Sequence, residues 1–496
     1  MSAACAAALS ASLLVSCAAP GTGGGTEKRG TSESTAEGAY TTRPEPLDER
    51  IEELDFGGRT VTILSRANDS DRTGREILSE ELTNDPVNDA IFNRNAYVCE
   101  VLGLKEIKQV VADGAGELQD LVGLMVNSGD QTYDIAAASV YWGTMMLQNG
   151  YMYNLLSNGI DDYLDPYRPW WAQYWVEQAE VAGRLYSITG APALSLTRMM
   201  FVFYYNKAFG EDLGIEDMYT VVNEGRWTID YLNELIAPLY LSVNGDDVRD
   251  ETDRYGLAIN HFENCDTFWS SFDMTMIERD EEGWFEYSSR QQEKIANAFE
   301  KVFYLIRENP GTYDTGSTSG FDVAKNMFAS GNTLFASIHL MYAETPEFRN
   351  MQSEYGILPA PKYNEEQKDY FTYAHDQYTI FMVPCTVADP ALCGAFLETM
   401  AYESYYSVQP TYYDLVLKGR YANDPQSRAM LDLITSHFRV DTSWIYGIMI
   451  GEPEANVFRE LIEDGLKKFA SAWATQEGAL PPRLARFRRT LEGIEY

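Results

Sequence analysis

The chain has 496 residues, a length that suits two large lobes or two to three domains rather than one small core. Hydrophobic residues make up 45% and charged residues 23%, so most of the chain can fold as a globular protein. The formal charge of −37 would repel both the phosphate backbone of nucleic acids and anionic lipid surfaces. We therefore expect no nucleic acid partner, and any membrane attachment must come from something other than a basic patch.

The first residues, 3–17, form an uncharged and mostly small, apolar stretch, and a tract rich in Gly, Thr, Ser and Glu follows. A short apolar run of this kind predicts a secretory leader over 1–17, and the polar tract predicts a flexible tether over 18–55. The alternative is a buried N-terminal helix that ends in an ordinary cysteine. Secretory leaders normally open with Lys or Arg, and 1–16 contains neither, so the true start codon stays open.

The sequence Leu-Val-Ser-Cys at 14–17 resembles the bacterial lipobox, in which the cysteine is lipidated and becomes the mature N-terminus. The resemblance implies that Cys17 carries a lipid anchor. Two acyl chains hold a protein durably at a membrane, whereas one chain holds it only marginally. The expected location is therefore the extracellular face of the cell membrane.

Short strands alternate with longer helices in the part of the chain that follows. The β-branched run 60–64 predicts a strand, 86–102 predicts a helix, and 133–138 predicts a short buried strand after a Gly-Asp turn. This alternation favours an α/β fold with largely parallel sheets.

Further along, short motifs occur in a fixed order: Gly-Arg-Leu-Tyr-Ser-Ile at 183–188, Phe-Tyr-Tyr-Asn-Lys at 203–207, Arg-Trp-Thr at 226–228, Ser-Gly-Asn-Thr-Leu-Phe-Ala at 330–336 and Tyr-Gly-Ile-Leu-Pro-Ala-Pro at 355–361. Each motif is short, but their order and spacing from residue 58 to the C-terminus resemble the extracellular solute-binding proteins of carbohydrate ABC importers. In the helix start at 226–228, Thr228 is the expected N-cap.

The resemblance implies a two-lobe, periplasmic-binding-protein-like fold with three chain crossings and a ligand cleft between the lobes. Hinges are expected near 194–197, 336–337 and 373–376. Lobe one would then comprise 58–194 plus 338–375, and lobe two 195–337 plus 376–496. The implied function is capture of a sugar or oligosaccharide by cleft closure and its delivery to the transmembrane permease subunits, without a cofactor.

Candidate ligand contacts are aromatic or polar residues that follow predicted strands or lie near the expected crossings. Sugars present flat apolar faces with hydroxyl groups at the rim, which aromatic rings and polar side chains match. Open α/β sheets bind ligands beyond the carboxyl ends of their strands. The expected contacts are Trp142, Tyr141, Arg66, Asp69, Trp269, His339, Tyr342, Asp376, Tyr378 and Trp444. Trp170 and Trp171, in contrast, are expected to pack in the core.

Two further features leave alternatives open. The segment 242–253 resembles a calcium-binding loop, but Ser242 and Asp247 depart from that pattern at two positions, so an ordinary acidic loop is the preferred interpretation. Cys385 and Cys393 are either a disulfide pair or free thiols. No metal site is expected.

The alternative functions are a secreted glycoside hydrolase and a surface polysaccharide-docking protein without a transporter. The sequence contains no Gly-x-Ser-x-Gly elbow, no His-Glu-x-x-His and no P-loop. With 75 acidic residues, pairs of carboxylates arise by chance and carry no weight. We therefore expect a binding protein and no enzyme. The identity of the solute, and whether it is a sugar, a polyol or a peptide, stays open.

Overall fold

A computed structural model describes residues 43, 45–67, 76–246, 248–317, 320–418 and 425–494. The described residues from 45 onwards form one compact unit. The expected leader, the lipidation site Cys17, most of the tether and the candidate ligand contact Asp69 lie outside the described residues. No helix in the described part of the chain is sufficiently long and apolar to cross a membrane.

The first sheet has four strands in the order β11-β3-β1-β2. β1 (Thr60–Arg66) pairs in parallel with β2 (Glu106–Ala112) and β3 (Ile135–Ser139), and β11 (Thr379–Met382) pairs antiparallel with β3. The expected strands 60–64 and 133–138 are thus confirmed as β1 and β3, with small shifts of their ends. Every residue of β3 is buried, as is usual for a central strand covered on both faces.

The helix expected over 86–102 is confirmed as α2 (Pro86–Val101). The Asp85 side chain caps it by accepting hydrogen bonds from the backbone N–H groups of Val87 and Asn88. Pro86 occupies the first turn, where its missing N–H leaves no hydrogen bond unmade. The local sequence therefore explains where this helix begins.

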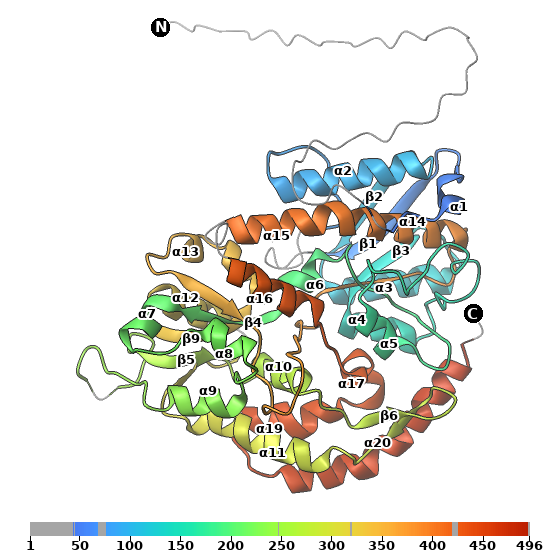
Figure 1. Cartoon of the computed structure of the whole chain (residues 1–496). Coiled ribbons are helices and arrows are strands. Elements are labelled where there is room, and N and C mark those ends of the chain that lie inside the picture. Colours follow the sequence, from blue (N-terminus) through green and yellow to red (C-terminus); the bar gives the residue numbers. More distant parts are fainter. Residues whose placement is uncertain are drawn as a thin grey trace, which may run out of the picture. The chain divides into compact units, whose positions relative to one another are not determined.

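The second sheet has five strands in the order β10-β4-β9-β5-β8. Its members are β10 (Tyr355–Leu358), β4 (Phe201–Asn206), β9 (Thr333–His339), β5 (Tyr255–Ile259) and β8 (Thr312–Asp314). β4 is antiparallel to both β9 and β10, whereas β5 is parallel to β9 and β8. In Figure 1 the strands β4, β5 and β9 lie together with α7, α8, α9 and α12, apart from the group of β1, β3 and α2.

The remaining elements are mostly short helices. They are α1 (Glu49–Glu52), α3 (Ala115–Ser128), α4 (Val140–Gln148), α5 (Gln173–Ala179), α6 (Leu194–Arg198), α7 (Lys207–Asp212), α8 (Met218–Asn223), α9 (Ile229–Ile236), α10 (Glu263–Ser271), β6 (Ile277–Arg279), β7 (Phe285–Tyr287), α11 (Gln292–Phe303), η1 (Tyr304–Glu308), α12 (Gly320–Ala329), η2 (Leu340–Glu344), α13 (Pro346–Arg349), α14 (Pro390–Glu403), η3 (Ser404–Val408), α15 (Gln409–Lys418), α16 (Pro425–Ser436), α17 (Thr442–Ile445), α18 (Gly447–Ile450), η4 (Ala455–Arg459), α19 (Glu460–Glu463) and α20 (Phe469–Glu492). Thr228 caps α9 as expected, because its side chain accepts from the Tyr231 N–H at 3.2 Å.

The strand pairing corrects the expected division of the chain. The chain passes from the first sheet to the second between β3 and β4, a stretch that contains 194–197, and returns between β10 and β11, a stretch that contains 373–376. The expected crossing at 336–337 is wrong, because these residues lie within β9 of the second sheet. Residues 338–375 therefore do not all belong with the first sheet, and β11 and α14, which contacts α2, do not belong with the second.

A buried carboxyl group ties these connecting segments together. Glu76 accepts hydrogen bonds from the backbone N–H of Ser195 at 2.6 Å and from its hydroxyl at 3.0 Å. The Thr379 hydroxyl donates to the same carboxyl group, and the Thr379 N–H donates to the Ser195 hydroxyl oxygen at 3.0 Å. Burial raises the pKa of Glu76. One side chain thus joins the first crossing, in α6, to the start of β11.

Trp170 and Trp171 lie in the core, as expected, at 1% and 2% exposure. Their indole N–H groups donate to the two oxygens of Glu398, at 3.0 and 2.9 Å. Burial raises the pKa of Glu398 to about 8, despite these hydrogen bonds. The folded chain therefore holds this proton over a pH range in which the unfolded chain has already released it.

The pKa of Glu398 predicts a pH dependence of stability. The contribution of its protonated form is fully present below its ordinary pKa of 4.5 and is lost as pH rises towards 8. The free energy of unfolding should therefore fall between pH 5 and 8, by up to about 1.4 kcal/mol per pH unit from this group. Urea unfolding at pH 5, 6, 7 and 8 should show a shallower slope in Glu398→Gln. The exposed Glu281→Gln is the control, and parallel curves for Glu398→Gln and the wild type would contradict the prediction.

Candidate ligand-binding site

A cavity of about 290 Å³ lies at the carboxyl ends of β1 and β3. It brings together four of the expected ligand contacts, because Arg66 ends β1, Tyr141 and Trp142 begin α4, and Asp376 precedes β11. The complete lining is Arg66, Ala115, Gly116, Ser139, Tyr141, Trp142, Asp376 and Gln377. These are the positions at which open α/β sheets bind ligands.

The aromatic side of the cavity is held by short-range packing. The rings of Tyr141 and Trp142 meet edge to face, with centroids 5.5 Å apart and an interplanar angle of 74°. A Cβ atom on Gly116 would lie 3.6 Å from the Trp142 ring, so this glycine provides the surface against which the indole packs. Tyr141 is 40% exposed and so offers its ring to the solvent side. The pair forms an apolar surface suited to the flat face of a ligand.

The polar side of the cavity carries both signs of charge. The Arg66 guanidinium donates to the backbone carbonyl of Gln377. The Asp376 carboxylate is 40% exposed and lies 3.5 Å from Nε2 of His375, while the Asp376 carbonyl accepts from the Val140 N–H at 3.2 Å. The last contact fixes the start of α4 against the segment that leads into β11. The cavity thus combines aromatic faces with donors and acceptors at its rim.

A second polar cluster lies deeper in the structure. Nη1 of Arg459, in η4, lies 2.8 Å from Oδ2 of Asp266, in α10, and the guanidinium carbon lies 5.2 Å from the ring centroid of Trp444. Tyr373, three residues before Asp376, packs on Trp444 with ring centroids 6.0 Å apart. Burial raises the pKa of Asp266 to about 7, against the opposing effect of Arg459. We refer to Asp266, Arg459 and Trp444 as the aspartate–arginine cluster.

Five other expected contacts that the structure describes do not line the cavity, and one of them, Trp444, belongs to the aspartate–arginine cluster. Trp269 is 1% exposed and packs on Phe458, and Tyr378 is equally buried between Trp175 and Phe438. His339 and Tyr342 are buried as well, with their rings stacked at 6.0 Å, and His339 also stacks on His375. The structure therefore places these four side chains in the core, and their role as ligand contacts stays a prediction.

Two groups near the site were missed by the sequence analysis. Asp266 lies one turn before Trp269 in the helix that follows β5, so the carboxyl-end rule could have found it. Arg459 follows no strand, and no sequence signal pointed to it. Its place beside Asp266 depends on the contact between η4 and α10.

In the loop 242–253 the carboxylate of the last residue, Asp253, is hydrogen-bonded by groups of the same segment of the chain. Asp253 is fully buried, accepts from the Tyr240 hydroxyl at 3.1 Å and accepts from the Val243 N–H at 3.0 Å. Its carboxylate therefore closes the loop on itself. Among the described residues, which omit Asp247 of this loop, no group of three or more His, Cys, Asp or Glu side chains is arranged to hold a metal ion. Cys385 and Cys393 form no disulfide, since their thiols face the carbonyls of Gly150 and Asp134, respectively.

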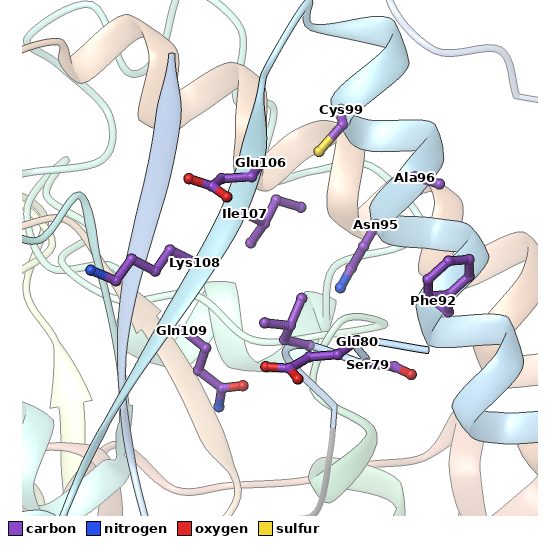
Figure 2. A pocket seen from close by; sticks show the side chains of 11 residues that line it. Ser79, Glu80, Phe92, Asn95, Ala96, Cys99, Glu106, Ile107, Lys108 and Gln109 are labelled. Carbon is purple, nitrogen blue, oxygen red and sulfur yellow. The ribbon is translucent and has the colours of Figure 1, made fainter. Parts of the chain in front are cut away.

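A larger cavity, of about 700 Å³, lies on the outer edge of the first sheet between β2 and α2. Figure 2 shows Glu106, Lys108 and Gln109 of β2 on one side and Phe92, Asn95 and Cys99 of α2 on the other. Its strand residues belong to the amino half of β2, away from the carboxyl ends at which the smaller cavity lies. We therefore take the smaller cavity as the candidate site.

Comparison with known proteins gives no sequence match but a clear structural one. No protein-family model matches the chain, and no curated protein has a matching sequence. A cyclo/maltodextrin-binding protein complexed with maltotetraose is similar in structure with a TM-score of 0.53 at 12% identity, covering 86% of this chain and 97% of its own. The chain has the two-lobe, periplasmic-binding-protein-like fold.

Two further solved structures share this fold. An ABC substrate-binding protein from Listeria monocytogenes, in complex with cycloalternan, gives a TM-score of 0.52 at 10% identity and covers 87% of this chain and 99% of its own. UgpB from Mycobacterium tuberculosis, in complex with glycerophosphocholine, gives 0.51 at 16% identity and covers 82% and 97%. The expected α/β two-lobe class is thus confirmed.

The buried ion pair predicts a large, pH-dependent effect of removing one partner. Arg459→Met leaves the Asp266 carboxyl buried without its cation, which should cost about 3–5 kcal/mol of unfolding free energy at pH 8. At pH 5 the carboxyl is protonated and the cost should be smaller, because the pKa of Asp266, already about 7, rises further without Arg459. Urea unfolding at both pH values measures the two costs.

The matched controls for this test are the double variant Asp266→Asn/Arg459→Met and the exposed Arg226→Met, whose ion pair with Glu216 lies at the surface. The double variant should recover most of the stability, because no charge is then left buried alone. Arg226→Met should change little. Equal losses for Arg459→Met at pH 5 and pH 8 would contradict the prediction.

Proposed function

We propose that the chain is the extracellular solute-binding subunit of a bacterial ABC importer, and that it captures a sugar or oligosaccharide and delivers it to the permease. The observation that carries the proposal is the cavity in which Tyr141 and Trp142 lie beside Arg66 and Asp376. Aromatic faces with a polar rim of both signs suit a polyhydroxylated ligand. The fold supports it, because solved structures with this fold include an ABC substrate-binding protein in complex with cycloalternan and a cyclo/maltodextrin-binding protein.

In the proposed mechanism the two lobes, each built around one of the two sheets, close around the ligand. In this proposal one lobe contains β1, β2, β3 and β11, and the other contains β4, β5, β8, β9 and β10. Open and closed forms differ by a few kcal/mol, and a ligand that contacts both lobes shifts the balance towards the closed form. The permease subunits then recognise the closed pair of lobe surfaces.

The location is part of the same proposal. A lipid on Cys17 would hold the protein at the outer face of the membrane, and the tract between it and the folded unit would let that unit reach the permease. The tether was expected to run to residue 55, but Leu47 and Ile51 are buried in the folded unit and 49–52 form α1, so it ends before residue 45. The alternatives are a glycoside hydrolase and a polysaccharide-docking protein without a transporter. Against the first, the two cited structures similar to this chain are binding proteins. A permease gene beside this one would argue against the second.

Thermal unfolding of the full chain against mono- and oligosaccharides, polyols and peptides tests the proposed function. A ligand at 100 times its dissociation constant should add roughly 2.7 kcal/mol to the free energy of unfolding and raise the midpoint. Trp142→Ala should abolish most of that shift, because it removes the aromatic face of the cavity. The exposed Tyr167→Ala, outside the cavity, should preserve it.

Two results would contradict the proposal. If no ligand raises the unfolding midpoint and the tested saccharides are hydrolysed in the same samples, the hydrolase is favoured. A shift that persists unchanged in Trp142→Ala would place the ligand elsewhere.

A further inference from the structure

The aspartate–arginine cluster contains polar atoms that lack a hydrogen-bond partner among the described residues. They are Oδ1 of Asp266, Nε of Arg459 and Nε1 of Trp444, and all three atoms are buried. The side chains contact one another, because Arg459 pairs with the other oxygen of Asp266 and lies over the Trp444 ring. One acceptor and two donors are therefore left unused in one place.

Unused buried polar atoms are uncommon, because taking them out of water costs free energy that a hydrogen bond normally offsets. Two buried carboxyl groups elsewhere in the chain are hydrogen-bonded on both oxygens, whereas Glu454, close to Arg459, has no such partner among the described residues. Glu398 receives two indole N–H donors, one on each oxygen, and Glu76 receives hydrogen bonds on both of its oxygens. The unused oxygen of Asp266 therefore suggests a partner that is not part of the chain.

None of the three residues lines the candidate cavity, but the cluster lies near it and combines elements from the sides of both sheets. Asp266 lies in the helix that follows β5 of the second sheet, whereas Trp444 lies in α17, which contacts α4 and α5. α4 carries Tyr141 and Trp142 of the cavity. The carboxylate of Asp376, which lines the cavity, acts electrostatically on Asp266. A ligand that reached from the cavity towards the second sheet would meet this cluster.

We propose that Asp266, Arg459 and Trp444 form the inner half of the ligand site, where they bind hydroxyl groups of an uncharged ligand and reject anionic ones. The inference rests on the proposed function and narrows its substrate class. A hydroxyl group both donates and accepts, so one ligand hydroxyl donates to Oδ1 of Asp266 and accepts from Nε1 of Trp444. A neighbouring hydroxyl accepts from Nε of Arg459.

The charge of the surroundings selects against phosphate and sulfate esters. The Arg459 guanidinium is already paired with Asp266, so it offers no uncompensated positive charge. Glu263 and Asp376 add negative charge around Asp266. An anionic group would therefore lose its hydration and meet an excess of carboxylates. Neutral sugars and polyols carry no such penalty.

Titration calorimetry on the full chain tests this with matched pairs of neutral and phosphorylated probes: glucose and glucose 6-phosphate, maltose and maltose 1-phosphate, glycerol and glycerol 3-phosphate. The wild type should bind the neutral member of its preferred pair at least 100-fold more tightly. Trp444→Phe keeps the ring and removes only the Nε1 donor, so it should weaken binding of that neutral probe roughly ten-fold. Trp473→Phe, a buried tryptophan of α20 that packs on Phe469, is the matched control and should bind as the wild type does.

Asp266→Asn supplies a readout that a purely structural role would not change. It removes the negative charge, so it should narrow the ratio of neutral to phosphorylated affinity by ten-fold or more. Asp266→Asn leaves Arg459 without its carboxylate, so circular dichroism first checks that this variant folds. If Asp266→Asn does not fold, the affinity of Trp444→Phe for the neutral probe tests the inference instead.

The outcomes separate the two claims. If no probe and no other sugar or polyol binds the wild type, the proposed function is wrong and this inference falls with it. If a neutral probe binds, loses affinity in Trp142→Ala, but binds Trp444→Phe unchanged, only the inner half of the site is wrong. Equal affinity of the wild type for a neutral probe and its phosphate ester would also overturn the inference.

Discussion

The Glu76 carboxyl group is the constraint on which the geometry of the site depends. It binds the Ser195 backbone and hydroxyl in the first crossing and the Thr379 hydroxyl at the start of β11. Both segments connect the two sheets, so their relative position fixes how the sheets meet. A buried carboxyl group is costly unless its oxygens are hydrogen-bonded, and here both oxygens are. The buried carboxyl group therefore fixes the position of α6 relative to the start of β11.

The position of β11 determines where the cavity lies. Because Thr379 pairs with Ser139 in the register of β11 and β3, the segment just before β11 is brought against the first turn of α4, where the Val140 N–H donates to the Asp376 carbonyl. Asp376 and Gln377 thereby face Arg66, Tyr141 and Trp142, although more than 200 residues of sequence separate the two groups. The site is thus assembled by strand pairing between distant segments, and the local sequence supplies only the chemistry of each side chain.

This division explains what the sequence could predict. The strands β1 and β3, the helix α2 and its Asp85 cap follow from local patterns, and the carboxyl-end rule located Arg66, Tyr141 and Trp142. The segments that contain β10 and β11 were assigned to the wrong lobes, because the sequence of a short buried strand does not indicate which sheet it joins. Trp269 and Tyr378 were expected at the ligand, but an aromatic residue near a crossing fills the core equally well. Arg459 could not be predicted, since only tertiary packing brings it to Asp266.

The buried carboxyl groups of the chain differ in how their oxygens are satisfied. Glu76 and Glu398 have hydrogen-bonded oxygens, so their burial is explained by the fold alone. Asp266 has an ion pair on one oxygen and nothing on the other, and its arginine and tryptophan neighbours have unused N–H groups as well. Replacing a buried ion pair by apolar side chains is often neutral or stabilising, so stability alone gives no reason to keep such an arrangement. A site that must pair the hydroxyl groups of a ligand does give one, because its unsatisfied groups are what reject a molecule that lacks them.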